Sequence, residues 1–223
     1  MHESIIYIAI NNYNNFKQII NNYVNGYIYV NLESKNTYNS KLIHMVCRCN
    51  PDSAELLINL IIQKKIFIDL NSVDDSGYTA LHYAIRYNTR IAKLLIESYI
   101  NKLLYLNLNI SNNFEEKPIH FACKYNFEIA ELLILSYLNN KIELDINFLQ
   151  YGKISILDYA FEYNEKIIAL LNKLVSKNKI DLNLYMNSKL KNIELIKFLI
   201  NKIDIKNCKI ENNPEIFKFL TYK

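Results

Sequence analysis

Residues 79–88 read TALHYAIRYN and residues 117–126 read KPIHFACKYN, so nearly the same ten-residue pattern returns after 38 positions. The pattern occurs twice more at the same interval, as KLIHMVCRCN at 41–50 and as SILDYAFEYN at 155–164. A fixed period of this length is typical of proteins that stack copies of one small structural unit. We therefore expect a solenoid in which each unit contacts its neighbours.

Three columns of this alignment carry related residues in every copy. The first holds histidine, or aspartate in the last copy: His44, His82, His120 and Asp158. The second holds a small or branched apolar residue: Val46, Ala84, Ala122 and Ala160. The third holds asparagine: Asn50, Asn88, Asn126 and Asn164. A fifth, weaker copy opens the chain at 7–20, with Ala9 in the apolar column.

Each copy is followed by a second apolar run with helical spacing. In RIAKLLIESYI at 90–100, Ile91, Leu94 and Leu95 share one helical face. The asparagine column then ends a first helix, and we expect it to reverse the chain in the left-handed conformation that Asn tolerates. Small residues in the first helix let the two helices approach closely. Short extended links follow at 68–71, 106–109, 144–147 and 180–183.

The segment DDSGYTALHYAI at 74–85 resembles the ankyrin repeat, and the resemblance covers roughly residues 5–183. The matching residues are Asp74, Gly77, Thr79, Leu81, His82 and Ala84. The resemblance implies an all-α ankyrin-repeat solenoid of stacked helix–turn–helix units with short hairpin-like links. The extra residues of the 38-residue period follow the paired leucines, which predicts a second helix longer by about one turn. The hairpin glycine is missing before the copies at 41 and 117, which predicts irregular hairpins there.

The domain organisation follows from where the repeats stop. Residues 1–183 are expected to form an array of about five repeats, of which the first is atypical. Residues 184–223 are expected to form shortened, Lys-rich capping helices, because the last repeat of an array needs a polar outer face. Alternatively, this segment continues a longer array.

Composition favours an ordinary folded protein of the cytoplasm. Hydrophobic residues make up 51% and charged residues 22% of the 223 positions. Four Cys do not suggest a disulfide framework, and no leader or apolar run of membrane-spanning length is present. We expect a monomer without a membrane partner, acting in a host cell if its source is a pathogen.

Candidate catalytic and metal-binding residues have structural interpretations. The resemblance implies that the histidine column ties each hairpin to its neighbour, and Asp158 can only accept hydrogen bonds when it is ionised. HMVCRC places His44, Cys47 and Cys49 close together, but a second pair of zinc ligands does not follow. GKIS at 152–155 lacks the spacing of a phosphate-binding loop. We therefore expect no catalysis, cofactor or metal.

Exposed positions beside the asparagine column carry the functional signal. They form one ladder of cations and one of tyrosines: Arg48, Arg86 and Lys124, and Tyr87, Tyr125 and Tyr163. The resemblance implies that these residues face the concave surface together with the hairpin residues Asp75, Ser76 and Tyr78. Tyrosine and arginine are the residues that most often dominate protein interfaces, and arginine binds carboxylates and phosphates in a bidentate manner.

The ladders favour a scaffold or adaptor that binds a protein partner with acidic character. Three alternatives remain at this point. Repeat duplication alone can copy a ladder without any binding role. The chain can be a targeting module of a larger assembly or a host-directed effector. It can also be an accessory nucleic-acid-binding protein, although a net charge of +4 and a pI of 8.7 are low for that class.

Overall fold

The computed structural model describes residues 8, 10–152 and 154–163, together with residues 170, 173, 174, 177 and 179. Within this part of the chain, two isolated β-bridges occur but no strand, so the expectation of an all-α protein is confirmed. The described residues form eight helices: α2 (Tyr13–Val24), α3 (Leu42–Cys49), α4 (Pro51–Ile62), α5 (Ala80–Tyr87), α6 (Thr89–Ile100), α7 (Pro118–Tyr125), α8 (Phe127–Leu138) and α9 (Ile156–Tyr163).

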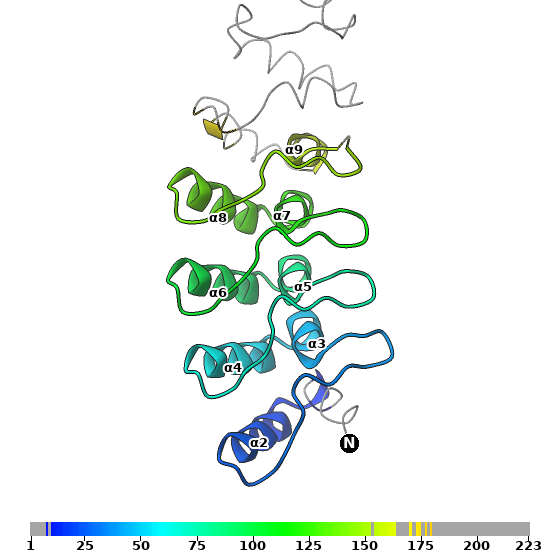
Figure 1. The fold of residues 1–223 in the computed structure, drawn as a ribbon, viewed down its shortest axis with the longest axis vertical. Coiled ribbons are helices and arrows are strands. Elements are labelled where there is room, and N and C mark those ends of the chain that lie inside the picture. The colour runs from blue at the N-terminus through cyan, green and yellow to red at the C-terminus, as the bar shows by residue number, and fades with distance from the viewer. Residues whose placement is uncertain are drawn as a thin grey trace, which may run out of the picture.

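The helices stack in two rows, as the resemblance implies (Figure 1). The short helices α3, α5, α7 and α9, called the first helices here, form one row. The longer helices α2, α4, α6 and α8, the second helices, form the other. Hairpins project on one side of the stack and the links that follow the second helices lie on the opposite side (Figure 1). The first helices begin at Leu42, Ala80, Pro118 and Ile156, which confirms the 38-residue period.

The core lies between the two rows and continues from each repeat into the next. Every first helix buries the same position completely or nearly so: Ile43, Leu81, Ile119 and Leu157. The second helices likewise bury Leu57, Leu95 and Leu133. Helices of 8 and 12 residues have too little surface to bury these side chains within one unit. The stack is therefore stable only as an array in which each repeat covers the next.

The asparagine column does not adopt the left-handed conformation that we expected. Asn50, Asn88 and Asn126 have φ of −140°, −153° and −150°, which is extended backbone. Their side chains instead cap the second helices, as in the bond from the Ser53 N–H to Asn50 Oδ1 at 3.0 Å. Asn is among the best N-cap residues because its side-chain oxygen satisfies a backbone donor of the first turn. The asparagine therefore stabilises the turn between the two helices by capping the second helix.

The first copy is offset by one residue from its expected register. Asn12 caps α2 by accepting a hydrogen bond from the Asn15 N–H at 3.1 Å, which aligns it with the asparagine column. The apolar column then falls on Ile8, 38 residues before Val46, and the expected Ala9 lies outside the described residues. The helical pattern alone could not fix this register, since the first copy lacks the histidine.

The hairpins that lack glycine are regular, contrary to expectation. In the complete repeat, the Gly77 N–H donates to the Asp74 carbonyl and Gly77 has φ of 77°. Asn39 and Glu115 take the same left-handed position with φ of 57°, at a cost of roughly 1 kcal/mol for a residue with a Cβ. One side chain at the start of each hairpin compensates by accepting two backbone N–H groups. These side chains are Asn36, Asp74 and Asn112.

The extra residues of the 38-residue period follow the paired leucines and lie within the second helices, as expected. α6 continues for five residues beyond Leu95 to end at Ile100. The link at 180–183 and the Lys-rich segment 184–223 lie outside the described residues, so the division into an array and a cap stays a prediction. Among the helices that are described, none is long and apolar enough to cross a membrane.

The close packing at Ala84 and Ala122 gives a direct test of the register. Both side chains are fully buried in the first helices, so Ala84→Leu and Ala122→Leu should each lower the free energy of unfolding by about 1–3 kcal/mol through overpacking. Urea unfolding followed by circular dichroism measures the change. Asn59→Leu, at an exposed position of α4, is the matched control and should change stability little. Equal stability of the three variants would contradict this packing.

Candidate functional site

The histidine column is buried at the start of the first helices and organises the fold. His44 Nδ1 accepts a hydrogen bond from the Lys41 N–H at 2.9 Å, and His82 Nδ1 accepts one from the Thr79 N–H at 3.2 Å. The Nε2 atoms of the same rings lie 2.8 Å and 3.2 Å from the Ser72 and Glu116 carbonyl oxygens. His82 thus joins its own repeat to the next hairpin, as the resemblance implies.

Burial keeps these imidazoles neutral. It lowers the pKa of His82 and of His120 to about 4, and it lowers the pKa of His44 as well. In the last copy of the pattern Asp158 takes over the cap, because its Oδ2 accepts from the Ser155 N–H at 2.6 Å and the Ser155 hydroxyl at 2.7 Å. The column is therefore part of the scaffold in the four copies that contain it.

The cysteines near His44 do not form a metal site with it. Cys47 is fully buried and its burial raises the thiol pKa to about 12, so it packs as a small apolar residue. Cys49 is exposed on the end of α3. Among the described residues, no group of three His, Cys, Asp or Glu side chains is arranged to hold a metal ion.

The two expected ladders interleave into a single row along the first helices. Arg48 lies over the Tyr87 ring at 5.5 Å, and Arg86 lies between two rings, at 5.3 Å from the centroid of Tyr87 and 4.8 Å from that of Tyr125. Lys124 Nζ lies 5.1 Å from the Tyr125 centroid. We call these five residues the cation–tyrosine row. Each cation sits within cation–π range of a ring from its own or the next repeat.

The row rests on buried and half-buried aromatic rings, of which only Tyr78 was expected from the sequence. Tyr83 stacks beside Tyr87 with ring centroids 6.4 Å apart, and Phe121 packs against Tyr125 at 5.1 Å. The half-buried Tyr78 contacts both Tyr83 and Phe121 at 5.5 Å. Tyr83 and Phe121 occupy one column of the repeat, directly before the Ala column. The recurrence of an aromatic residue at this position was a signal available in the sequence.

A carboxylate beneath the row fixes the orientation of Tyr83. The Tyr83 hydroxyl donates to Asp74 Oδ2 at 2.5 Å, and the Ser40 hydroxyl donates to the same oxygen at 3.4 Å. Partial burial and the Asp74 carboxylate raise the pKa of Tyr83 well above its usual range. Asp74 therefore shapes the hairpin with one oxygen and holds the base of the row with the other.

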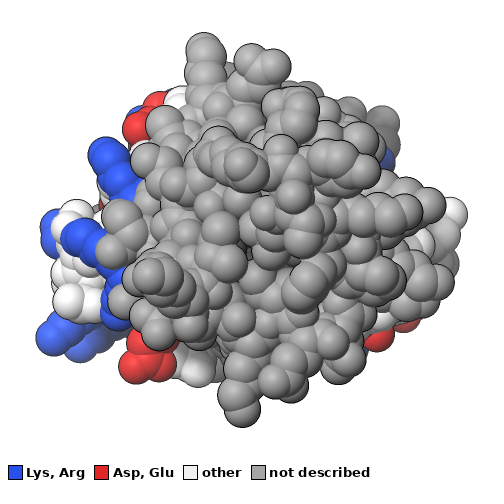
Figure 2. All heavy atoms as spheres, turned by 90° about the horizontal axis from the view of Figure 1, so that it is seen from above, with Lys and Arg blue, Asp and Glu red and all other residues white. Residues whose placement is uncertain are grey.

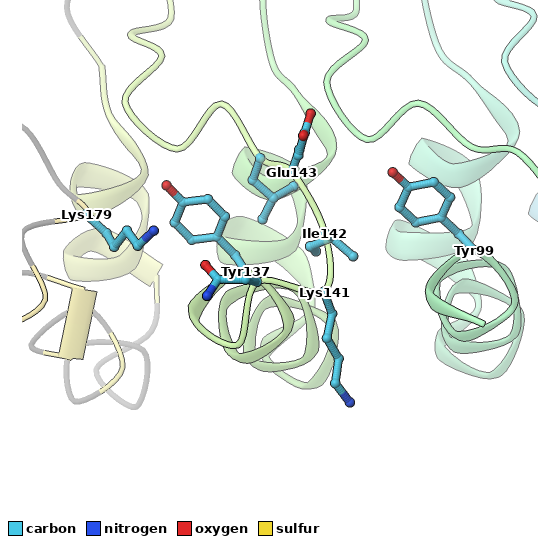
Figure 3. A pocket seen from close by; sticks show the side chains of 8 residues that line it. Tyr99, Tyr137, Lys141, Ile142, Glu143 and Lys179 are labelled. Carbon is cyan, nitrogen blue, oxygen red and sulfur yellow. The ribbon is translucent and has the colours of Figure 1, made fainter. Parts of the chain in front are cut away.

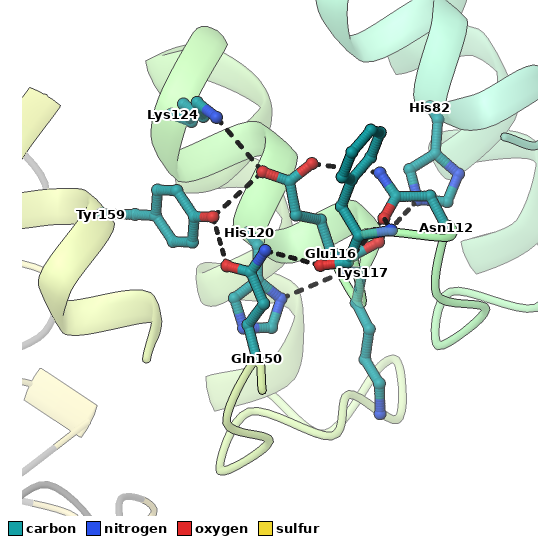
Figure 4. A network of polar contacts seen from close by, with 9 residues as sticks. His82, Asn112, Glu116, Lys117, His120, Lys124, Gln150 and Tyr159 are labelled. Atoms are coloured by element: carbon teal, nitrogen blue, oxygen red, sulfur yellow. Dashed lines mark hydrogen bonds and ion pairs between the residues drawn. The ribbon is translucent and has the colours of Figure 1, made fainter. Parts of the chain in front are cut away.

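A second buried carboxylate, that of Glu116, fixes the orientation of side chains in the next repeat (Figure 4). Glu116 is 5% exposed, and its Oε1 lies 3.2 Å from Lys124 Nζ and 3.0 Å from the Tyr159 hydroxyl. Asn112 Nδ2 donates to Glu116 Oε2 at 3.0 Å, and Gln150 Oε1 lies 2.5 Å from the Tyr159 hydroxyl. Since His82 Nε2 also bonds to the Glu116 carbonyl oxygen, three repeats meet in one polar network.

The three cations of the row therefore differ in their surroundings. Lys124 is partly buried; burial lowers its pKa, but hydrogen bonds to Tyr125 and Glu116 raise it more, so its pKa is raised overall. Arg48 and Arg86 are exposed, and no ion pair joins either of them to a carboxylate within the described part of the chain. Their guanidinium groups are held by rings and keep N–H donors facing solvent.

The structure describes the side chains of three of the four other predicted residues. Asp75 and Ser76 are exposed at a hairpin tip, where their backbones bond to adjacent hairpins: the Asp75 N–H donates to the Tyr38 carbonyl at 3.2 Å and the Asn113 N–H to the Ser76 carbonyl at 3.0 Å. Tyr78 supports the row from below, as described above. Tyr163 ends α9, and its side chain lies outside the described part of the structure.

One hollow of about 680 Å³ lies away from the row, beside the last links of the array (Figure 3). Tyr99 and Tyr137, from consecutive second helices, line it together with Lys141, Glu143 and Lys179. Lys179 lies over the Tyr137 ring at 5.4 Å from the centroid. The hollow is open and has mixed charge, and it contains none of the residues selected from the sequence.

The neutral histidines predict a specific dependence of stability on pH. The pKa of His82 and His120 is about 4 in the folded state and about 6.5 in the unfolded chain. Between these values the unfolded state binds more protons, so stability falls as the pH drops from 6.5 toward 4. At pH 5 each histidine should remove about 2 kcal/mol of unfolding free energy. Urea unfolding at several pH values measures this loss.

His82→Gln supplies the matched comparison, because it removes one titrating ring. Its unfolding free energy should depend less steeply on pH between 6.5 and 4 than that of the parent, whatever its stability at neutral pH. Parallel pH profiles for parent and variant would contradict the burial of neutral His82.

Comparison with known proteins agrees with this architecture. A family model described as ankyrin repeats (three copies) matches residues 5–104, which reach from the first copy to just beyond α6. No curated protein matched the chain. α7, α8 and α9 repeat the helix bounds of the matched part at the same 38-residue interval. Ankyrin repeats generally mediate protein–protein interactions as non-catalytic scaffolds. Residues 5–104 thus carry ankyrin repeats, and helix pairs at the same interval continue from them to the end of α9.

Proposed function

We propose that the chain is a non-catalytic recognition module that binds a protein partner along its first helices. The observation that carries the proposal is the cation–tyrosine row, in which cations and rings from successive repeats alternate. Tyr87 and Tyr125 remain 47% and 40% exposed, so each ring supports a cation and still offers surface to a partner. Tyrosine provides a large contact area with little loss of conformational freedom.

The row favours a partner with carboxylates on its surface. Arg48 and Arg86 occupy the same column of adjacent repeats, so their spacing follows from the stack. A guanidinium held flat against a ring has already lost part of its rotational freedom, which lowers the entropic cost of binding. Lys124, which is neutralised by Glu116, contributes less to this preference. The two arginines therefore account for most of the proposed preference for a partner with carboxylates.

A nucleic-acid partner is the second candidate, and the same arginines suit phosphate. The overall charge favours protein, because a net charge of +4 and a pI of about 8.7 are low for a nucleic-acid-binding protein. Binding to nucleic acid would also weaken steeply with salt, by an amount that grows with the number of phosphates contacted.

The test is affinity capture from cell lysate treated with nuclease, with the full chain and the variant Arg48→Glu/Arg86→Glu as baits. We expect at least one protein to be retained by the parent and reduced about tenfold or more on the variant, which corresponds to about 1.4 kcal/mol. The captured protein is then purified and its affinity for both baits measured directly.

A second variant, Lys64→Glu/Lys102→Glu, is the matched control. It reverses two exposed cations outside the cation–tyrosine row, so the net charge changes by the same amount. The proposal requires that this control keep the partner. Equal loss from both variants would mean that overall charge, and not the row, decides binding, and equal retention by all baits would place the interface elsewhere.

A further inference from the structure

A second surface of the array, formed by the links after the second helices, also repeats. Each link begins with a residue in the left-handed conformation: Gly26, Lys64, Lys102 and Asn140, with φ between 54° and 76°. Its N–H and the next one bond back to the helix, as the Lys64 and Lys65 N–H groups do to the Ile61 and Leu60 carbonyls at 2.9 Å. This is the Schellman arrangement that ends many helices.

Three residues after that turn, a large ring projects into solvent in three consecutive repeats. Tyr29, Phe67 and Tyr105 are 83%, 81% and 74% exposed. They are separated by 38 residues each and so follow the edge of the stack from one repeat to the next. In the same links, Tyr27 and Leu103 are also exposed. Single exposed apolar residues are common on protein surfaces. Here they recur in three consecutive links, and this repetition favours an interaction surface.

Lysines accompany the rings on this edge. The tips of the links at 63–67, 101–105 and 139–143 hold four exposed lysines and one glutamate: Lys64, Lys65, Lys102, Lys141 and Glu143. Viewed from above, Lys and Arg gather on the left, which is the side on which Figure 1 shows the links (Figure 2). We call Tyr29, Phe67 and Tyr105 with these lysines the link edge.

The nearby acids compensate this charge only in part. Asp145 is paired with Lys117 at 2.5 Å, away from the tips. Asp69 accepts the Asn71 N–H within its own link, and Glu97 is exposed one turn before the end of α6. The tips themselves therefore present cations. Lys64 and Lys102 do so at positions where glycine, as at residue 26, would be less strained.

We infer that the link edge binds the surface of an anionic lipid bilayer. Amphipathic rings such as tyrosine concentrate at the headgroup level of membranes, and lysines near the surface are attracted to anionic lipids. Side chains that project singly from the links of a regular stack can enter a soft surface without a matching pocket.

The exposure and spacing of the three rings favour a bilayer over single-stranded nucleic acid. Nucleic-acid strands are usually held in a basic groove whose rings stack with successive bases. The three rings here are one repeat apart and nearly fully exposed on a projecting edge. We expected no membrane partner because the sequence has no run of membrane-spanning length, but a contact at the headgroup level needs no such run.

The test is co-sedimentation of the full chain with vesicles of phosphatidylcholine alone and of phosphatidylcholine mixed with phosphatidylserine. We expect binding to the mixed vesicles that is lost at high salt. Tyr29→Ser/Phe67→Ser/Tyr105→Ser should reduce the bound fraction about fivefold or more. Tyr38→Ser/Phe114→Ser/Tyr151→Ser is the matched control, since it removes three exposed rings from the hairpins on the opposite side, and it should bind like the parent.

A further variant separates the effect of charge on vesicle binding from any effect on stability. Lys64→Gly/Lys102→Gly removes two cations at positions whose backbone suits glycine, so it should unfold no more easily than the parent while binding mixed vesicles more weakly. Equal sedimentation with both vesicle types would overturn the inference. So would equal binding by the two triple variants, or selective binding of single-stranded RNA that the link-edge substitutions abolish in the absence of any vesicle binding.

Discussion

The structure depends on the burial of one apolar face of each repeat by the next. A pair of helices of 8 and 12 residues cannot cover Leu81 and Leu95 by itself, so the side chains become buried only when successive units stack in a single register. The register is enforced at both ends of the first helix. His82 bonds to the following hairpin, and the fully buried Ala84 allows close contact between helices. A slip by one residue would expose the core and break these hydrogen bonds together.

The same register creates the two surfaces to which we assign functions. Because each repeat places Arg86 and its equivalents beside a ring of the next unit, the cation–tyrosine row is a property of the stack and not of any single repeat. The link edge arises in the same way on the opposite side, where Phe67 and Tyr105 follow one another. Protein recognition along the first helices and lipid contact along the links would leave each other's surface free, so both could operate at once.

Much of the fold was predictable because the residues that recur in each repeat have clear local structural roles. The 38-residue interval, the buried histidines and the helix pairs all follow from sequence columns. The role of Asn50 was predicted wrongly because Asn serves both left-handed turns and N-caps, and only the backbone distinguishes them. The regular hairpin at Glu115 was missed because hydrogen bonds to Asn112 outweigh the strain. Contacts between repeats were the hardest part: the positions of Arg86 and Tyr125 were evident, but their interleaving depends on the stacking geometry, which no single repeat encodes.

The central claim is that stacking holds Arg86 against the Tyr125 ring of the next repeat before any partner binds. Nuclear magnetic resonance of the full chain tests it most directly, because an aromatic ring shifts the signals of protons that lie over its face. We expect the side-chain methylene protons of Arg86 to resonate upfield of their usual position and to return toward it in Tyr125→Ala. Arg90, which pairs with Asp52 on the outer helices, should be unaffected. Arg86 signals at their usual positions, unchanged by Tyr125→Ala, would contradict a preformed row.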